Sequence, residues 1–491
     1  MSKSSGFTAE ERMLIDGQLV PAEGNRTYDN VNPATEEVIG QVADASRDDM
    51  LRAIEAARRA FDETSWSTDH AFRKQCLLQL HDAFESEKEE VRAELVAEAG
   101  APLMTTYLAQ LDVPLSDAFK WPAEHMDDFQ WERKLDDSNN FGVASRRMVW
   151  KEAIGVVANI VPWNYPFEVT SNKLAQTLAT GNTAVVKPAP DTPWNATRLG
   201  RLIAEKTDIP AGVVNVVPCS DNQIAEELLV DPRVDMVSFT GSTGVGKRIM
   251  EKGAATLKRV FLELGGKSAH IVLDDADFAT TLPYAAGMCM HAGQGCVLLT
   301  RLLVQERRYE EAVELVANAF RDVTYGDPTD PKNMMGPLVS ARQRDRVMGY
   351  IQKGVDEGAR LVVGGHRPAH LPRGYYVEPT VFADVTNDMT VAREEIFGPV
   401  ICVMSYRDEE DAIRIANDSD YGLGAAVTSA DLDRALAVAR RLRAGALTVN
   451  GGVWYGADSP YGGYKSSGIG RQNGIEGFEQ YLETKAVAIG I

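Results

Sequence analysis

The chain has 491 residues, which is enough for about three domains, and 44% of them are hydrophobic, so it can bury a large core without disulfides or metals. Its 71 acidic residues against 51 Lys and Arg give a net charge of −20. A surplus of this sign argues against a nucleic-acid partner, which requires a basic surface, and against docking on an anionic membrane.

The cysteines and the N-terminal segment indicate the compartment. Five cysteines are scattered without a CxxC pair, so neither a disulfide framework nor a cysteine zinc site is indicated. The first residues, MSKSSGFTAEERM, lack the apolar region of a signal peptide. The longest nearly apolar run, Ala153 to Trp163, is too short to span a membrane. We therefore expect a soluble, cytoplasmic protein with no metal site.

The first predicted elements lie in the N-terminal half. The pattern of Ser46–Phe61 predicts a helix with a capping residue at Ser46 and Asp49 three positions later. From about residue 150, short apolar strands alternate with helical stretches such as Asn195–Lys206 and Gln223–Leu229. The expected strands are Ile154–Ile160, Thr183–Val186, Val213–Val217 and Met236–Phe239. This alternation predicts parallel βαβ units that bind ligands beyond the carboxyl ends of the strands.

A second α/β series is expected over residues 258–447. It includes a helix at Tyr309–Phe320 and strands near Leu361–Val363 and Ala446–Val449. The tail Thr484–Ile491 alternates enough to form a strand that pairs with another element or another subunit. The pattern therefore predicts two α/β halves that meet at a cleft, an architecture common among enzymes.

The segment Gly241–Lys247, GSTGVGK, directly follows a predicted strand. It resembles the phosphate-binding loop GxxxxGK[ST], but Arg248 stands where the magnesium-binding hydroxyl is needed. A glycine loop that opens a helix still offers backbone N–H groups to a phosphate. A purely structural turn is the alternative for this segment.

Cys296 follows the small residues of Gly293-Gln-Gly, which leave room for a substrate to approach the sulfur. A thiolate is a strong nucleophile, and its formation requires a lowered pKa. The alternative is a buried, inert cysteine, since most free cysteines are of that kind. His291 lies five positions away, and a Cys–His hydrolase pair is a weaker interpretation of it.

Two further segments carry groups suited to catalysis. Glu263 ends an apolar strand and precedes two glycines and Lys267, a setting that suits a general base or a solvated turn. In Val161-Pro-Trp-Asn-Tyr-Pro166, two prolines fix the backbone around Asn164. The amide of Asn164 is thus a candidate donor to an oxyanion, with a rigid turn as the alternative.

Taken in order, these motifs resemble those of the aldehyde dehydrogenase superfamily from about Met13 to Val487. The matching segments are PWNYP, FTGST, ELGGK, GQGC, EEIFGP (Glu394–Pro399) and PYGGYKSSG (Pro460–Gly468). The resemblance implies that Cys296 attacks an aldehyde to form a thiohemiacetal, with Asn164 and the backbone N–H of Cys296 holding the oxyanion. After hydride transfer to a nicotinamide, Glu263 would activate the water that hydrolyses the thioester.

The resemblance also implies a cofactor site. Lys187 would bind the adenosine ribose with Trp163 nearby, Gly241 and Ser242 would lie at the pyrophosphate, Glu395 would hold the nicotinamide ribose and Phe397 would pack beside the nicotinamide. The remaining cofactor-binding positions would be Val161, Val245 and Leu264. Many members that prefer NAD carry Glu where this chain has Pro190, and the loss of that carboxylate removes one argument for NAD over NADP. NAD is still favoured, and NADP stays open. The region Cys219–Ala225 also lacks the family's GxGxxxG stretch.

The resemblance assigns the wall of the aldehyde tunnel to Glu168, Val169, Asn172, Val297, Tyr455 and Tyr461. The tyrosines, with Trp454 adjacent, favour an apolar or aromatic aldehyde. Glu168 leaves open a cationic amino-aldehyde. Two different interpretations of the whole chain also stay open. One is a coenzyme A-acylating relative, against which Glu263 argues, and the second is a catalytically silent protein of the same fold.

The fold implied is a Rossmann-like dinucleotide-binding domain, an α/β catalytic domain and a small β-ribbon. The expected ranges are 8–123 and 148–257 for the first, 258–447 for the second, and 124–147 with 470–491 for the ribbon, while 448–469 returns along the tunnel. The ribbon of this family typically makes dimers or tetramers, so a homo-oligomer is expected.

Overall fold

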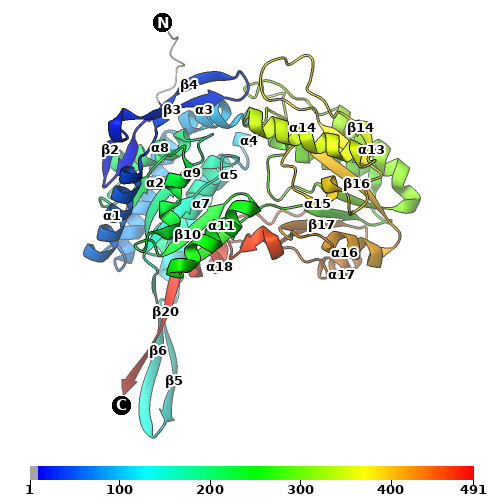
Figure 1. The fold of residues 1–491 in the computed structure, drawn as a ribbon. Helices are drawn as coiled ribbons and strands as arrows, with labels where there is room; N and C mark the ends of the chain where they lie inside the picture. The colour runs from blue at the N-terminus through cyan, green and yellow to red at the C-terminus, as the bar shows by residue number, and fades with distance from the viewer. Residues whose placement is uncertain (1–8) are drawn as a thin grey trace.

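The computed structural model describes residues 9–491, in which the elements form two sheets covered by helices and a projecting ribbon (Figure 1). The first sheet has eight strands in the order β19-β11-β10-β7-β8-β9-β1-β2. Its five parallel strands are β7 (Val156–Ile160), β8 (Thr183–Lys187), β9 (Val214–Val216), β10 (Met236–Thr240) and β11 (Arg259–Glu263). Its antiparallel strands, β1 (Met13–Ile15), β2 (Gln18–Val20) and β19 (Gly468–Ile469), lie toward the edges.

Alternate side chains of this sheet enter two separate cores, as the pleat of a strand requires. Ala184 and Val186 of β8 join one cluster, and Val185 between them joins the other. The first cluster includes residues of α2 (His70–Ser86), α3 (Lys88–Ala99), α6 (Lys120–Asp128), α7 (Pro166–Ala179) and α8 (Trp194–Lys206). The second includes residues of α1 (Arg47–Glu63), α10 (Glu227–Val230) and α11 (Thr243–Gly253). Helices therefore cover both faces, as predicted for parallel βαβ units.

The second sheet has seven strands in the order β14-β15-β16-β13-β12-β17-β18, and only β14 is antiparallel to its neighbour. The strands are β12 (Ala269–Val272), β13 (Arg301–Gln305), β14 (Arg360–Val363), β15 (Thr380–Ala383), β16 (Val400–Tyr406), β17 (Gly424–Thr428) and β18 (Ala446–Val449). The accompanying helices are α12 (Phe278–Thr281), α13 (Tyr309–Arg321), α14 (Ala341–Asp356), α15 (Thr390–Arg393), α16 (Glu409–Asn417) and α17 (Leu432–Ala439).

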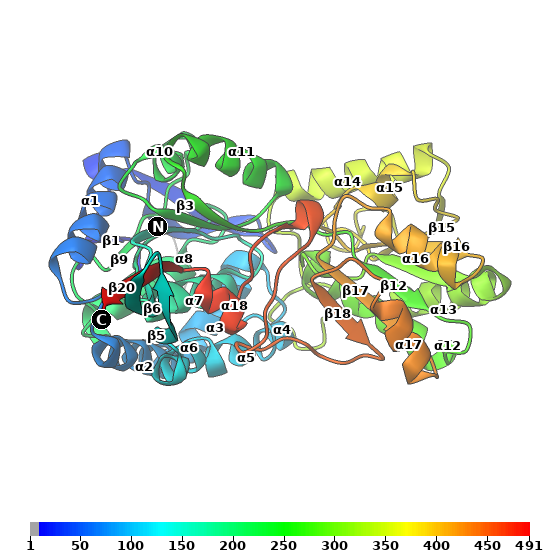
Figure 2. The ribbon, with the colours of Figure 1, turned by 90° about the horizontal axis from the view of Figure 1, so that it is seen from below.

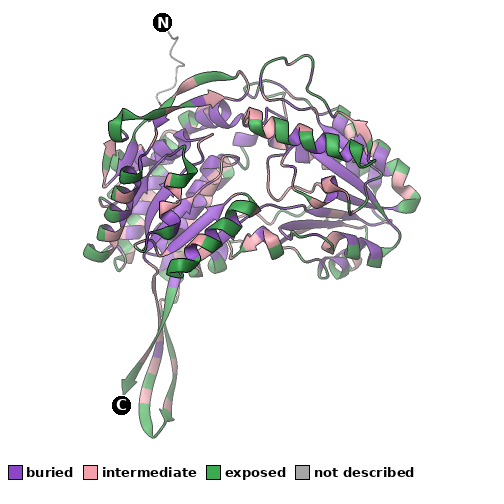
Figure 3. Ribbon diagram, in the orientation of Figure 1, coloured by how far each residue is buried: buried purple, intermediate pink, exposed green. Residues whose placement is uncertain are grey.

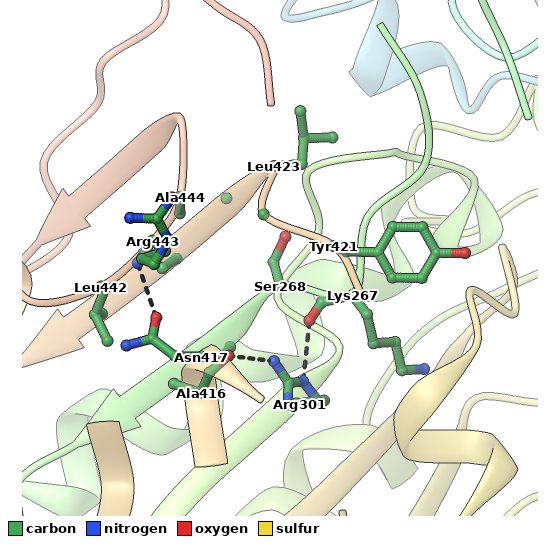
Figure 4. Close-up of a pocket in the computed structure, with 14 residues that line it drawn as sticks. Lys267, Ser268, Arg301, Ala416, Asn417, Tyr421, Leu423, Leu442, Arg443 and Ala444 are labelled. Atoms are coloured by element: carbon green, nitrogen blue, oxygen red, sulfur yellow. Dashed lines mark hydrogen bonds between the residues drawn. The ribbon is translucent and has the colours of Figure 1, made fainter. Parts of the chain in front are cut away.

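Arg301 anchors the second sheet from within (Figure 4). Its buried guanidinium donates to the backbone carbonyls of Lys267, Ile415 and Ala416 at 2.9–3.0 Å. These bonds tie the start of β13 to the segment before β12 and to the end of α16. The hollow beside it measures only about 20 Å³, so we assign the cluster a structural role.

A three-stranded ribbon projects from the body in Figure 1, in the order β20-β6-β5. Its strands are β5 (Glu132–Asn140), β6 (Val143–Ala153) and β20 (Leu482–Gly490), and most of their side chains are exposed (Figure 3). The predicted tail strand thus pairs with β6 over its full length. A separate hairpin is formed by β3 (Thr27–Asn32) and β4 (Glu37–Ala43).

Figure 2 shows the two helix-covered sheets side by side, with the chain passing between them more than once. The remaining short helices are α4 (Leu103–Thr106), α5 (Asp112–Asp117), α9 (Asn222–Ala225) and α18 (Gly474–Glu479). The α/β fold class is confirmed, whereas the predicted domain boundaries remain expectations, and residue 8 of the first range lies outside the described residues. Over residues 9–491, no helix has the length and apolar character needed to cross a bilayer.

Most predicted elements lie within a few residues of the observed ones. Helix α1 has the full capping box, because Ser46 accepts from the backbone N–H of Asp49 and Asp49 accepts from that of Ser46. The prediction of one helix at Gln223–Leu229 is wrong: α9 ends at Ala225 and α10 begins at Glu227. Asp221 caps α9, whereas α10 has no side-chain cap of its own.

Candidate active site

A cavity of about 650 Å³ lies beyond the carboxyl ends of β10 and β11, where loops of both halves meet. It brings together thirteen of the residues predicted from the sequence: Trp163, Asn164, Glu168, Val169, Gly241, Ser242, Val245, Glu263, Leu264, Cys296, Glu395, Phe397 and Tyr461. Catalytic, cofactor and tunnel candidates therefore share one space. This position agrees with the rule that open parallel sheets bind ligands at the carboxyl edge.

Two glycines after Glu263 let three motifs approach one another. A Cβ on Gly265 would come within 2.2 Å of a carboxylate oxygen of Glu395, and a Cβ on Gly266 within 2.5 Å of the carbonyl oxygen of Cys296. The N–H of Gly266 also donates to Glu395 Oε1 at 2.9 Å. Glycine is required at both positions because any larger residue would separate these groups.

The thiol of Cys296 lies against a tyrosine. The Sγ atom is 3.1 Å from the hydroxyl oxygen of Tyr461, close enough for a hydrogen bond. Burial first, and then the charge of Glu263, raise the pKa of Cys296 well above its usual value. The lowered pKa expected of a reactive cysteine is therefore not a property of the site by itself, and the thiol needs a base to give up its proton.

Glu263 is a buried carboxylate with one oxygen, Oε1, that has no hydrogen-bond partner among the described residues. It ends β11, where it pairs with Gly468 of β19. Burial raises its pKa, whereas the charge of Lys173 and the neighbouring Cys296 and Tyr461 lower it, and the net pKa is about 8. A carboxylate with a pKa near the working pH suits proton transfer.

The amide of Asn164 is held by the loop that carries Cys296. Its Nδ2 atom donates to the carbonyl of Gln294 at 2.9 Å, which leaves the second amide hydrogen for another acceptor. Gln294 is itself fixed, because its side chain donates to the carbonyl of His291 and accepts from the N–H of Val339. The site thus presents Asn164 as a preorganised donor close to the cysteine loop.

His291 is not placed as a base for the thiol. It is fully buried, neither of its ring nitrogens has a hydrogen-bond partner in the described structure, and its ring lies 5.6 Å from that of Tyr165. Burial lowers its pKa to about 4, so the ring is neutral at physiological pH. A ring with so low a pKa is a weak base, and no hydrogen bond joins it to Cys296 in the described structure, so a Cys–His pair is not favoured.

The other end of the cavity can hold a dinucleotide. Helix α11 begins at Thr243 with Ser242 as its capping residue, and Gly241, Ser242 and Val245 line the cavity, so the N-terminus of this helix faces it. Trp163 and Phe397 meet edge-to-face at 5.4 Å. Glu395 stands in the cavity wall as an acceptor for a ribose hydroxyl, and the contact that Gly265 permits holds it there. These features fit a nicotinamide dinucleotide.

Predicted residues that do not line the cavity lie around it. Lys187 is buried at the end of β8, where its carbonyl accepts from the N–H of Val161, and burial lowers the pKa of its amine. Asn172 and Tyr455 contact Glu168 in the wall. Val297 lines a second cavity of about 630 Å³, on the other side of Trp454.

Sequence reasoning missed several lining residues. Gln343 and Arg346 of α14 bind the backbone carbonyls of Phe397 and Glu395 at 2.8 and 2.9 Å. Gln472 reaches the buried amine of Lys173 at 3.5 Å. None of these three belongs to a motif, and only the fold brings them to the cavity. No group of three or more His, Cys, Asp or Glu residues suited to a metal occurs within residues 9–491.

Comparison with known proteins identifies the family of the chain. The sequence profile of the aldehyde dehydrogenase family matches residues 19–487. The chain is 41% identical to a 3-succinoylsemialdehyde-pyridine dehydrogenase of Pseudomonas sp over 96% of this chain and 97% of that protein. It is 40% identical to a mitochondrial aldehyde dehydrogenase of Leishmania tarentolae, over 97% and 94% of the two chains. The chain therefore belongs to the aldehyde dehydrogenase family.

Solved structures extend the likeness to the fold. A betaine aldehyde dehydrogenase from Staphylococcus aureus in complex with NAD+ superposes with a TM-score of 0.94 at 35% identity, covering 98% of this chain and 95% of that one. The indole-3-acetaldehyde dehydrogenase of P. syringae in complex with NAD+ gives 0.95 at 36% identity, with 100% and 98% covered. The protein is thus an enzyme of the aldehyde dehydrogenase class.

Proposed function

We propose that this protein oxidises an aldehyde to the carboxylic acid with NAD+, through a covalent intermediate on Cys296. The observation that supports this most directly is the shared cavity, in which a partly buried thiol, an unpaired carboxylate oxygen of Glu263 and the amide of Asn164 surround one space. This set contains a nucleophile, a base and an oxyanion donor. NADP stays a second candidate, because Pro190 offers no carboxylate to exclude a 2′-phosphate.

The first step joins the sulfur to the aldehyde carbon. The thiol proton passes to Glu263, because the raised pKa of Cys296 keeps the thiol protonated until a base accepts the proton. The carbonyl oxygen becomes an oxyanion, to which Asn164 donates through its second amide hydrogen. Tyr461 lies 3.1 Å from the sulfur and limits the directions from which the substrate can approach.

The second half of the reaction converts the thiohemiacetal into the acid. NAD+, when bound, supplies the acceptor for the hydride that leaves the substrate carbon. The resulting thioester remains attached to Cys296 until water attacks its carbonyl. Glu263 first releases the thiol proton to solvent, and its carboxylate can then take a proton from that water. The hydroxide adds to the thioester carbon, the carbon–sulfur bond breaks, and the acid leaves while Glu263 returns its proton to the sulfur.

The residues of the tunnel support an aldehyde with an apolar or aromatic body. Trp454 and Tyr461 stack at 4.9 Å with an interplanar angle of 8°, and Tyr455 lies beside Trp454. Such an aromatic wall favours flat or apolar groups. Two similar enzymes are named for aldehydes that contain an aromatic ring, 3-succinoylsemialdehyde-pyridine and indole-3-acetaldehyde, which is consistent with this choice.

A homo-oligomer joined through the ribbon is part of the proposal. The three strands of the ribbon expose most of their side chains, including Ile489 at the C-terminal end and Phe141 at the hairpin turn. Strands β5 and β20 both present unpaired edges, which favour pairing with another chain.

Replacing the nucleophile tests the proposed function. Cys296→Ala should abolish NADH formation from every aldehyde, because no thiohemiacetal can form. Cys289→Ala is the matched control: Cys289 is equally free of a disulfide but buried in the core of the second sheet, so this variant should keep turnover. The measurement is NADH absorbance over a panel of aldehydes. Turnover in Cys296→Ala would contradict the assignment.

A further inference from the structure

Glu168 places a carboxyl group in the wall of the tunnel. It lies in the first turn of α7, and part of its surface is open to the cavity. Its Oε1 atom accepts two hydrogen bonds, from Asn172 Nδ2 at 2.6 Å and from the hydroxyl of Tyr455 at 3.0 Å. Both donors are neutral, and together they fix the orientation of the carboxyl group.

The second oxygen of Glu168 has no such support. No described residue donates a hydrogen bond to Oε2, and Glu168 takes part in no ion pair within residues 9–491. Lys173, the cation that influences it, is instead bonded to Ser238 and lies over the ring of Phe261. Burial accordingly raises the pKa of Glu168 to about 7. A desolvated carboxyl group of this kind costs stability unless something compensates it.

The surroundings of Oε2 show what can compensate it. The cavity that Glu168 lines is also lined by Val169, Tyr165 and Tyr461. A substrate with an apolar body fills this space, yet an entirely apolar one would leave Oε2 without a donor. Sites that place a polar group against the substrate discriminate strongly in favour of the partner that pairs with it.

We propose that Glu168 Oε2 accepts a hydrogen bond from the substrate, so that the preferred aldehydes carry a donor, a hydroxyl or a protonated amine, at the end remote from the aldehyde. This inference rests on the proposed function and adds its substrate class: an apolar or aromatic body with a hydrogen-bond donor. Asn172 and Tyr455 position the acceptor and do not touch the substrate's reacting atoms.

The test compares matched substrates within one enzyme preparation. meta- and para-Hydroxymethylbenzaldehyde are paired with meta- and para-ethylbenzaldehyde, which have the same number of heavy atoms but no donor. A further substrate, the protonated dimethylaminomethylbenzaldehyde, is compared with the same ethyl compounds and distinguishes a charged donor from a neutral one. In the wild type, kcat/KM should favour at least one donor-bearing aldehyde by about tenfold, the worth of roughly one good hydrogen bond.

Glu168→Gln should bring this ratio close to one for the protonated amine, because an amide nitrogen replaces the acceptor oxygen and a protonated amine has no lone pair with which to accept from it. The ratio does not depend on how much of the variant is folded, so a structural defect alone cannot mimic the result. Tyr455→Phe leaves the carboxylate in place and should retain the direction of the preference. Glu314→Gln, the same substitution at an exposed position of α13, is the control for charge.

Two results would overturn the inference. One is a wild-type ratio near one for every donor-bearing aldehyde, and the other is a preference for the protonated amine that survives in Glu168→Gln. Either result leaves the proposed function standing as long as NADH forms. Absence of NADH with every aldehyde would instead contradict the proposed function itself.

Discussion

Cys296 and Glu263 influence each other in opposite directions: the charge of Glu263 raises the pKa of Cys296, whereas the neighbouring thiol lowers the pKa of Glu263. The pKa of the thiol is raised by burial and by the carboxylate, and the pKa of the carboxyl group is raised to about 8 by burial. A proton shared between such groups moves easily from sulfur to oxygen once an aldehyde takes the electron pair of the sulfur. We therefore expect the protonation of these two side chains to determine the pH at which the enzyme works.

Turnover should rise with pH until about pH 8. Only the ionised form of Glu263 can accept a proton, and its pKa of about 8 leaves most of it protonated at pH 6. The steady-state rate should therefore increase about tenfold per pH unit well below that value and level off above it. Initial rates at saturating aldehyde and cofactor, measured across this range, check the expectation.

Glu263→Gln is the matched variant for this profile. Its amide has the same shape but cannot take a proton from water, so the variant should lose the rising limb and turn over at least a hundredfold more slowly. If acylation proceeds in the variant, stopped-flow traces should also show a burst of NADH before the slow phase. A variant that kept the profile of the wild type would exclude Glu263 as the base.

The candidate site was predictable from the sequence to the extent that its chemistry sits in short motifs. Cys296, Glu263 and Asn164 each lie within a few residues of glycines or prolines that mark a special backbone. The contact of Tyr461 with the thiol joins residues 165 positions apart, and no local pattern predicts it. Gln343 and Arg346 reach the site because α14 crosses it, which depends on tertiary packing.

At the scale of elements, helix α8 owes its start to a distant side chain. Its capping position is Pro193, which provides no side-chain hydrogen bond. Glu98 at the end of α3 takes this role, because its carboxylate accepts from the backbone N–H groups of Trp194 and Asn195 at 2.9 and 3.2 Å. The carboxylate also accepts from the side-chain amides of Asn30 and Asn195. The alternation of strands and helices predicted α8, but not this link between elements.

Glu98→Gln should therefore destabilise the protein. The amide nitrogen of the variant would face two hydrogen-bond donors, whichever way it turned, and we expect a loss of about 1–3 kcal/mol in the free energy of unfolding. Denaturant unfolding followed by circular dichroism measures it. Glu90→Gln on the exposed face of α3 is the control and should unfold like the wild type. Equal midpoints for the two variants would show that Glu98 does not support α8.

At the scale of the whole molecule, the ribbon is the element that projects from the two helix-covered sheets. It contributes few residues to the cores of the two sheets, and its exposed strands carry apolar side chains at their outer ends. A net charge of −20 adds repulsion between molecules but does not prevent pairing between strand edges. We therefore expect any association of subunits to use the three-stranded ribbon.

Ile489→Asp should shift the protein toward smaller assemblies. The substitution places a charge on the exposed end of β20, where a partner strand would bury it. Light scattering coupled to size-exclusion chromatography measures the mass. Val355→Asp adds the same charge to an exposed valine of α14 and should leave the mass of the wild type. If both variants keep the same assembly, the ribbon does not join subunits through this strand.

The segment from Tyr461 to Leu482 connects the thiol to the ribbon. Tyr461 forms a β-bridge with Gln472, Gly468 pairs with Glu263, and the chain then passes through α18 into β20. Because these pairings are continuous along the chain, a displacement of β20 would also move the segment that contacts Cys296 and Glu263. Subunits that pair along β20 would hold this segment from outside, so specific activity should fall as dilution separates them, while β20 stays paired with β6 and the two sheets stay folded.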